Sequence, residues 1–381
     1  MRPPIARRFS HGQFLLSVES TNRFYGKDLY IMQTAHKIRV LIVDDSIIAR
    51  RVLDDGLSRD PRLEVVGHAI NASDARRKIA LLKPDVLTLD VEMPGQSGLE
   101  FLKEYIPQNP LPVVLCSSLN IRVFDALSAG AVDFVRKPDM SLPSSVDLFQ
   151  RELALKVRAA SRAHVRTAAT IQRTLRAHPT SILPPLTSSA LNDVIIALGA
   201  STGGTEATLE VLRHLPANTP GIVIVQHMPV GFTEMYAERL NRICKMEVRE
   251  AKNGDRIERG LALIAPGDMQ MKVVHTGNGY TVSCVNEPKV SGHRPSVDVL
   301  FHSMAQSVKC KQVGIILTGM GRDGARGLLE MRQHGAFTIG QDEATSVVYG
   351  MPMEAYKLGA VCHQEPLEHI SDVLLRHLGT L

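Results

Sequence analysis

Residues 194–204 read VIIALGASTGG, an apolar run that ends in a glycine-rich turn holding one serine, Ser201. The G-x-S-x-G pattern is typical of a nucleophile elbow, in which small neighbours let the chain bend sharply and leave the hydroxyl at the carboxyl edge of a sheet. The alternative is a phosphate-binding turn of a dinucleotide fold. Two features disfavour it. Ser201 replaces the central glycine of such a turn. The next apolar run, residues 222–225, is followed by His227, in the place where a general base is expected, and not by a ribose-binding carboxylate.

Length and composition limit the class of protein. The 381 residues suffice for two ordinary domains, and a hydrophobic fraction of 44% can fill two cores. The five cysteines show no CxxC spacing, which indicates neither a disulfide framework nor a zinc site, so we expect a reducing cytoplasm. The longest apolar runs are strand-sized, and residues 1–20 lack the apolar region of a signal peptide, so we expect a soluble protein. A net charge of +5 does not by itself argue for nucleic acid.

The chain divides into four sections. Residues 1–36 are polar and irregular, and we expect either a disordered tail or a stretch ahead of the true start codon. Residues 37–139 and residues 191–381 each alternate short apolar runs with helical stretches. Such alternation predicts two doubly wound α/β domains with parallel sheets, joined by a linker, residues 140–190.

The linker is basic and then flexible. Its middle, residues 151–176, contains seven Lys or Arg and one Glu, and residues 179–189 are rich in Pro, Thr and Ser. We expect a solvated basic helix followed by a tether, with a nucleic-acid contact as the less favoured alternative. Further along, residues 272–286 look like a hairpin with its turn at 277–279.

In the first domain, polar residues follow the apolar runs. The runs that predict strands are residues 40–43, 65–69, 86–89, 113–116 and 133–135. Asp44 and Asp45 follow the first run and Asp90 follows the third. Three carboxylates at one sheet edge would repel one another unless a hard divalent cation lay between them, and Mg²⁺ with oxygen ligands suits the site. Lys137 and the Ser117 hydroxyl would then face an anion bound at Asp90.

Residues 38–138 resemble the response-regulator receiver domain. The residues on receiver motif positions are Asp44, Asp45, Asp90, Ser117, Phe134 and Lys137. The resemblance implies that Asp90 accepts a phosphoryl group from a histidine kinase and that Asp44 and Asp45, with Asp90, hold Mg²⁺. It also implies that Ser117, Phe134 and Lys137 form the switch that senses the phosphoryl group.

In the second domain, the partners of Ser201 are expected at two other strand ends. His227 follows one buried run, and residues 313–324, VGIILTGMGRDG, form another run with a glycine-rich turn and then Asp323. An acid there would orient the imidazole and stabilise its charged form. The chain order Ser…His…Asp differs from the Ser…Asp…His order of α/β-hydrolases, which disfavours that superfamily. Backbone N–H groups of the turn at residues 319–321 are suited to bind an oxyanion.

Three other histidines could compete for the role of base. They are His214, His293 and His302, which lie on apparent helices or in the loop around residues 291–295. A single histidine in such a place is more often structural, so we prefer His227.

Five motifs of the second domain resemble those of the chemotaxis protein-glutamate methylesterases, the CheB family. They are GASTGGTE at 199–206, QHMP at 226–229, IAPGD at 264–268, HRPSVD at 293–298 and LTGMGRDG at 317–324. The resemblance implies a catalytic triad of Ser201, His227 and Asp323, with Thr202 and Met320 lining the site and no cofactor for the hydrolase reaction.

The same resemblance implies a biological role. The expected reactions are hydrolysis of glutamate methyl esters on methyl-accepting chemotaxis receptors and deamidation of selected receptor glutamines, for sensory adaptation. The expected place is cytoplasmic and peripheral to receptor arrays, without embedding in the membrane and without nucleic acid. A receiver ahead of a hydrolase also predicts that the unphosphorylated receiver covers the triad and that phosphorylation opens access to it.

Two classes of protein remain as alternatives. One is a receiver fused to a DNA-binding module, although no helix-turn-helix spacing follows the receiver. The other is a doubly wound ligand-binding domain without catalysis. Turnover of a simple ester, lost in Ser201→Ala, would separate an enzyme from the second alternative.

Overall fold

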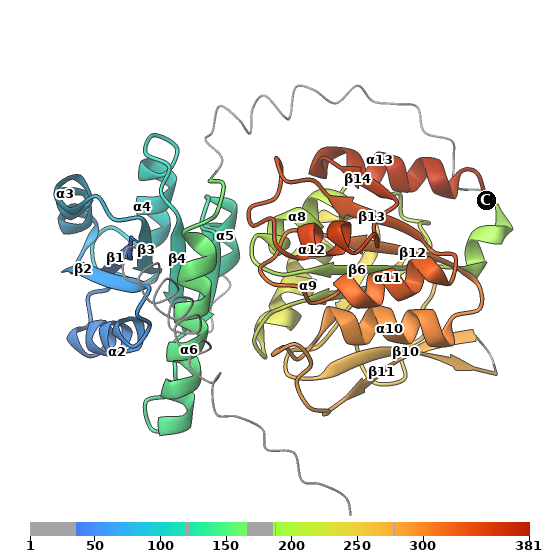
Figure 1. The fold of residues 1–381 in the computed structure, drawn as a ribbon, viewed down its shortest axis with the longest axis horizontal. Coiled ribbons are helices and arrows are strands. Elements are labelled where there is room, and N and C mark those ends of the chain that lie inside the picture. Colours follow the sequence, from blue (N-terminus) through green and yellow to red (C-terminus); the bar gives the residue numbers. More distant parts are fainter. Residues whose placement is uncertain (1–35, 119–121, 166–185, 187, 278) are drawn as a thin grey trace, which may run out of the picture.

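The computed structural model describes residues 36–118, 122–165, 186, 188–277 and 279–381. The predicted amino-terminal extension lies outside the described residues apart from His36, and so does the predicted linker between residues 166 and 185. Two α/β lobes lie side by side (Figure 1). The first ends with α6 (Pro143–Ala160) and the second begins with the short helix η1 (Ser189–Asp193).

The first lobe is built on five parallel strands in the order β2-β1-β3-β4-β5. The strands are β1 (Ile38–Val43), β2 (Leu63–Ala69), β3 (Val86–Asp90), β4 (Val113–Ser117) and β5 (Asp133–Arg136). Between them lie α2 (Ile47–Ser58), α3 (Ala72–Leu82), α4 (Gly98–Tyr105) and α5 (Arg122–Ser128). Because the chain changes direction across the sheet between β1 and β3, the carboxyl ends of these two strands lie side by side at the crevice where such folds bind ligands.

Short polar residues begin the helices of this lobe. The Ser46 and Asn71 side chains accept hydrogen bonds from backbone N–H groups of α2 and α3. Ser97 and Glu100 form a reciprocal capping box at the start of α4. Each side chain satisfies backbone donors that the first helical turn leaves without a partner, so the sequence itself fixes where these helices start.

Helix α6 differs from the solvated helix that we expected within residues 140–190. Its apolar side chains Phe149, Leu153 and Val157 are buried, and it contacts α2 and β5. Their i, i+4 spacing forms an apolar stripe that the basic residues around it obscure in the sequence. This part of the predicted linker is therefore packed on the first lobe, whereas the predicted domain bounds of 139 and 191 stay a prediction.

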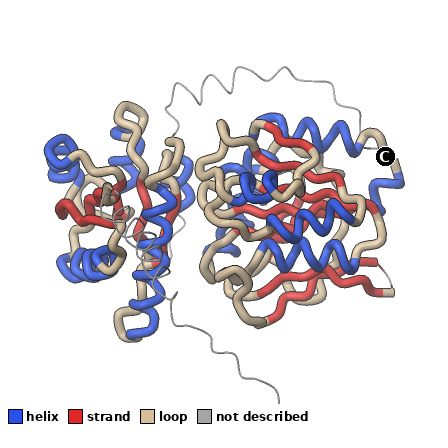
Figure 2. The backbone as a smooth tube through the Cα atoms, in the orientation of Figure 1, coloured by secondary structure: helices blue, strands red, loops and turns tan. Residues whose placement is uncertain are grey.

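The second lobe is built on seven parallel strands in the order β14-β13-β12-β6-β7-β9-β8. The strands are β6 (Val194–Ala200), β7 (Gly221–Gln226), β8 (Glu247–Glu250), β9 (Leu261–Ile264), β12 (Lys311–Ile316), β13 (Phe337–Gln341) and β14 (His363–Glu365). An antiparallel hairpin, β10 (Gln270–Thr276) and β11 (Gly279–Val285), confirms the hairpin predicted near residues 272–286. Together the two sheets confirm the predicted pair of parallel-sheet α/β domains (Figure 2).

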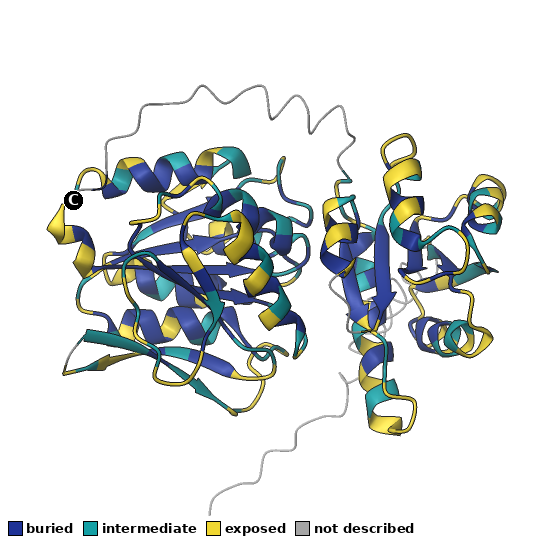
Figure 3. Cartoon of the chain, turned by 180° about the vertical axis from the view of Figure 1, so that it is seen from behind, coloured by how far each residue is buried: buried dark blue, intermediate teal, exposed yellow. Residues whose placement is uncertain are grey.

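Helices cover both faces of the seven-stranded sheet. One face packs against α8 (Gly204–Leu212), α9 (Phe232–Ile243) and α13 (Leu367–Leu378). The other packs against α10 (Val297–Ser307), α11 (Ala325–Gln333) and α12 (Met351–Lys357). Strands covered on both faces have no solvent side, which explains why β6 and β7 are continuous apolar runs and are buried along their whole length (Figure 3).

The central strands bring the site together. Strand β6 lies between β12 and β7, so the carboxyl ends of all three strands meet at one edge, where the order of the chain across the sheet reverses. Within the described part of the chain, no helix is both long and apolar enough to cross a membrane.

Candidate active site and phosphoacceptor site

Ser201 lies in a tight turn between β6 and α8. Its N–H donates to the Thr318 carbonyl at 3.0 Å, and its own carbonyl accepts from the Gly204 N–H at 2.7 Å. Gly203 has a φ of 76°, and a Cβ there would lie 2.5 Å from Val347. A residue with a side chain would be strained at this position and would also collide with its neighbour. The turn is therefore the strand-to-helix bend that the glycine-rich sequence predicts.

The side chains of Ser201, His227 and Asp323 meet at this edge of the sheet. His227 Nε2 lies 2.8 Å from Asp323 Oδ2, and His227 Nδ1 lies 3.1 Å from Ser201 Oγ. Because an ionised carboxylate only accepts hydrogen bonds, Nε2 carries the proton and donates to Asp323. That leaves the Nδ1 lone pair facing the serine hydroxyl, which is the arrangement a general base requires.

Asp323 is held as an anion by the start of α10. Ser296 Oγ donates to its Oδ1 at 2.7 Å, the Val297 N–H donates to Oδ2 at 2.8 Å, and the Asp298 N–H donates to Oδ1 at 3.1 Å. Burial raises the pKa of Asp323, but the hydrogen bond from His227 and those from Ser296 and Asp298 outweigh it and lower the pKa to about 2. The carboxylate is thus charged and fully engaged near neutral pH.

The turn expected to bind an oxyanion is partly occupied by the protein itself. The Gly319 N–H donates to the Val348 carbonyl at 3.0 Å, so the expectation is wrong for this donor. The Val348 N–H in turn donates to Thr318 Oγ1 at 2.9 Å, and Gly319 forms an isolated β-bridge with Tyr349, so residues 348 and 349 pair with the start of this turn. Met320 follows Gly319 in the turn and is half-buried.

Gln226 is a residue of the site that our selection of catalytic residues missed. Its side-chain amide donates to the Ser201 carbonyl at 2.8 Å and so ties the serine turn to the end of β7. The signal was present, since Gln226 directly precedes His227 at the end of an apolar strand.

Thr202 points toward the first lobe. It is buried, and its hydroxyl donates to Asp133 Oδ2 at 2.5 Å, with Asp133 at the start of β5. Asp133 Oδ1 also lies 3.1 Å from Lys156 of α6. Burial lowers the pKa of Lys156, but the charges of Asp133 and Glu152 outweigh this and raise it above its ordinary value. A polar chain therefore joins the residue after Ser201 to two elements of the first lobe.

Aromatic side chains form the rest of this contact. The Phe134 ring of β5 lies 4.6 Å from the Phe232 ring of α9, and the Phe124 ring of α5 lies 5.6 Å from the Tyr236 ring. In Figure 1, α5 lies on the side of the first lobe that faces the second. The β5–α5 side of the first lobe thus covers α8 and α9 next to the serine turn.

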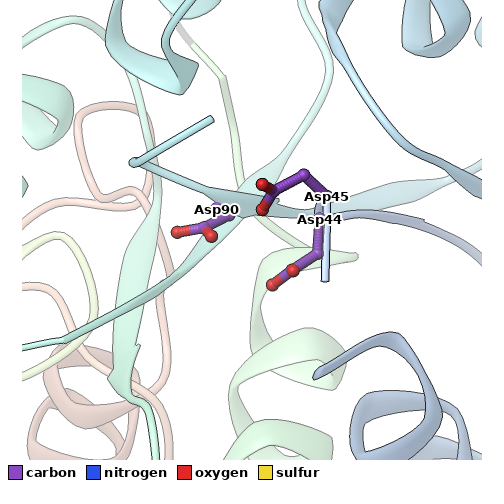
Figure 4. A group of neighbouring side chains, drawn as sticks. All are labelled: Asp44, Asp45 and Asp90. Atoms are coloured by element: carbon purple, nitrogen blue, oxygen red, sulfur yellow. The ribbon is translucent and has the colours of Figure 1, made fainter. Parts of the chain in front are cut away.

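The predicted phosphoacceptor residues also meet. One carboxylate oxygen each from Asp44, Asp45 and Asp90 can be chosen so that all lie within 4.8 Å of one another (Figure 4). Lys137 Nζ lies 2.6 Å from Asp90 Oδ2 and 2.9 Å from Asp44 Oδ2. Burial raises the pKa of Asp90 and the Lys137 ion pair only partly offsets this. Clustered hard oxygen ligands that repel one another fit a divalent cation such as Mg²⁺.

Two of the three predicted switch residues, Ser117 and Phe134, differ in their partners. Ser117 ends β4 and is fully buried, and its hydroxyl makes no hydrogen bond to any of the described residues. Phe134 is also buried and touches the second lobe through Phe232. Among the described residues the Ser117 hydroxyl thus has no partner, whereas Phe134 links β5 to the second lobe.

These two sites define a class of protein: a response regulator whose output domain carries a serine–histidine–aspartate cluster. The receiver lobe has its acidic cluster and lysine, and the output lobe has its nucleophile turn at the centre of a doubly wound sheet. Neither a DNA-binding module nor a plain dinucleotide fold combines these features.

Comparisons with known proteins identify the family. The family model for the response regulator receiver domain matches residues 40–142, and that for the CheB methylesterase matches residues 196–374. A protein-glutamate methylesterase/protein-glutamine glutaminase of Syntrophomonas wolfei is 53% identical over 91% of this chain and 99% of its own length. Relatives of the same name from Syntrophotalea carbinolica and Sulfurimonas denitrificans are 50% and 48% identical, over 85% and 87% of this chain and 92% and 96% of their own lengths. The chain belongs to the protein-glutamate methylesterase/protein-glutamine glutaminase family, which confirms both predicted resemblances.

Proposed function

We propose that this chain hydrolyses methyl esters of glutamate side chains on chemoreceptors, and deamidates receptor glutamines, under the control of phosphorylation at Asp90. The observation that carries the proposal is the position of His227 between Ser201 Oγ, at 3.1 Å, and Asp323 Oδ2, at 2.8 Å. The names of the relatives, which specify protein glutamate and protein glutamine, supply the substrate class.

The hydrolase reaction follows from the three side chains. Ser201 Oγ attacks the ester carbonyl while Nδ1 of His227 takes the hydroxyl proton, and Asp323 stabilises the resulting imidazolium. The proton then passes from Nδ1 to the leaving oxygen, and methanol departs. Water, deprotonated in turn by His227, attacks the acyl-enzyme and releases the glutamate carboxylate and Ser201.

The same residues serve an amide substrate. With a glutamine side chain, His227 delivers its proton to nitrogen and ammonia leaves in place of methanol. The amide is the poorer substrate because its carbonyl is less electrophilic and its leaving group is worse. Thr202 and Met320 line the site, and the backbone N–H groups of Met320 and Gly321, without that of Gly319, are the candidates to hold the oxyanion.

Control resides in the receiver lobe. Asp90 accepts the phosphoryl group from a histidine kinase, and Lys137 is close enough to donate to the new phosphoryl oxygens. Asp44, Asp45 and Asp90 would hold Mg²⁺, which neutralises charge between the donor and the carboxylates. Ser117 and Phe134 sense the product. The unphosphorylated receiver covers the serine turn through the contact between Asp133 and Thr202, and its release opens access.

The proposed setting is cytoplasmic and peripheral to receptor arrays. The domain bounds that go with it are 37–139 for the receiver and 191–381 for the catalytic domain. Residues 140–190 would join the two.

The test is release of methanol from methylated receptor membranes, with and without a phosphodonor. Ser201→Ala should lower turnover by on the order of a millionfold, because it removes the nucleophile. The fold should stay intact, because the substitution makes no core cavity. Ser307→Ala, at the far end of α10, is the matched control and should keep the wild-type rate. Activity of Ser201→Ala within about tenfold of wild type would rule out Ser201 as the nucleophile.

A further inference from the structure

The ring of His293 lies flat against the ring of His227. The two ring centroids are 3.7 Å apart and the planes differ by 8°. The Ser201 and Asp323 contacts are both made at the edge of the His227 ring and not on its faces. His293 packs against one of these faces, in a site where the His227 side chain is only 8% exposed.

The backbone of His293 is itself fixed. His293 and Val290 exchange both of their backbone hydrogen bonds, at 2.9 and 3.0 Å. The Gln270 side chain donates to the His293 carbonyl at 3.2 Å, and the next residue, Arg294, forms an ion pair with Asp268 at 2.7 Å. The stacked ring therefore projects from a loop that is anchored on both sides.

The same segment continues to the acid of the triad. Three residues after His293, Ser296 caps α10 and donates to Asp323 Oδ1. Val297 and Asp298 donate to the same carboxylate through their N–H groups. Residues 293–298 thus contact the face of the base and the whole carboxylate of the acid.

We propose that His293 is a positioning residue of the hydrolase reaction: its ring fixes the plane of His227 and covers one of its faces, so that Nδ1 stays aimed at Ser201. The proposal rests on the triad proposed above. It goes beyond that triad because it assigns a role to a histidine outside the triad.

The charge of His293 suits this role. Burial and the neighbouring His227 lower the pKa of His293 to about 3, with Lys156 and Lys289 adding to the shift and Asp323 opposing it. His293 is therefore neutral above about pH 3. When His227 takes the serine proton, it becomes charged against a neutral aromatic ring rather than against a second cation.

Two substitutions separate stacking from the imidazole chemistry of His293. His293→Phe keeps a flat aromatic ring, whereas His293→Asn removes it. In the phosphorylated full chain, His293→Asn should lower kcat by roughly tenfold to a hundredfold, the size of effect that small misplacement of a catalytic group produces, with KM changed less than about twofold. His293→Phe should stay within about threefold of wild type.

The pH profile supplies a readout that a purely structural role would not move. In His293→Asn the pH profile of kcat/KM should differ from that of wild type, because water then reaches the face of the His227 ring that His293 covers. His293→Phe should keep the wild-type profile. His302→Phe on the exposed side of α10 is the control and should change neither kcat nor the profile. Thermal unfolding of every variant is followed in parallel.

Each outcome decides the matter. A folded His293→Asn with the wild-type kcat and pH profile would overturn the proposal. An equal loss of kcat in His293→Asn and His293→Phe would also overturn it, because that result would point to the imidazole nitrogens instead of the stack. If His293→Asn does not fold, His293→Gln and His293→Phe carry the same comparison. An active Ser201→Ala would instead refute the triad, so the two failures can be distinguished.

Discussion

Asp90 in the first lobe and Asp323 in the second both lie at the carboxyl edge of a parallel sheet, and burial raises the pKa of both carboxyls. Their net shifts are nevertheless opposite. Asp90 has one cationic partner, Lys137, and the like charge of Asp44 beside it, so its pKa stays raised. Asp323 has His227 and three donors from the start of α10, so its pKa falls to about 2.

The difference separates two kinds of site. The acidic cluster of the receiver is incomplete by itself, because its carboxylates need an external cation and gain an external phosphoryl group. The carboxylate of the hydrolase site is already satisfied by the protein, so that site is preorganised and needs only access to its substrate. The receiver site changes when it binds a cation and gains a phosphoryl group, whereas the hydrolase site changes only in how accessible it is to its substrate.

The largest expected effect comes from substitutions of His227 and Asp323 in the preorganised hydrolase site. His227→Ala should lower turnover by on the order of a millionfold, comparable to loss of the nucleophile. Asp323→Asn should cost less, about ten-thousandfold, because the aspartate orients and stabilises the imidazole without reacting. Single-turnover methanol release measures both. Equal rates for Asp323→Asn and wild type would show that the carboxylate contributes nothing to catalysis.

Phosphorylation at the receiver site should instead be lost when its divalent cation is removed. Acetyl phosphate or a kinase should label Asp90, and chelation of Mg²⁺ should prevent the labelling, because the cation neutralises charge between the donor and three carboxylates. Mass spectrometry of the labelled peptide locates the modification. Labelling of Asp90→Asn at the wild-type level, or labelling that persists under chelation, contradicts the assignment.

Smaller effects are expected at the contact between the lobes. A fragment beginning at Leu191 should be about 5- to 150-fold more active than the unphosphorylated full chain, because a docking equilibrium of about 1 to 3 kcal/mol would be removed. Methanol release by the fragment, the full chain and the phosphorylated full chain is compared. Asp90→Asn in the full chain should stay at the basal rate.

A single substitution sharpens the same comparison. Asp133→Asn weakens the charged hydrogen bond to Thr202 and should raise the basal rate of the full chain, up to about tenfold. Asp125→Asn on the exposed side of α5 is its control. A fragment no faster than the full chain would show that the receiver does not occlude the site, and phosphorylation would then act by recruitment or by direct stimulation.

The sequence predicted the parts of the molecule that depend on local pattern. Ser201 and His227 directly follow strands buried on both faces, and such strands are visible as continuous apolar runs. Asp44, Asp45 and Asp90 were predicted for the same reason. The side chains of these residues meet because parallel strands bring their carboxyl ends to one edge.

What the sequence did not predict depends on contacts between distant segments. His293 is a single histidine in a loop, and only the folded chain places it on His227. The pairing of Thr202 with Asp133 joins residues of different lobes and has no local signal. Helix α6 was misjudged because its basic residues hide a narrow apolar stripe. Ser296 caps α10, but nothing local in the sequence indicates that its hydroxyl donates to Asp323.

The hydrogen bond between Thr202 and Asp133 has a reciprocal consequence. If the closed arrangement must open for a receptor segment to reach Ser201, and also opens when Asp90 is phosphorylated, then both events draw on one equilibrium. Thermodynamic linkage requires the coupling to be equal in both directions. A chain bound to its receptor should therefore populate the open, phosphorylated state more than a free chain does. At a given concentration of phosphodonor, receptor-bound chains would then be activated the most.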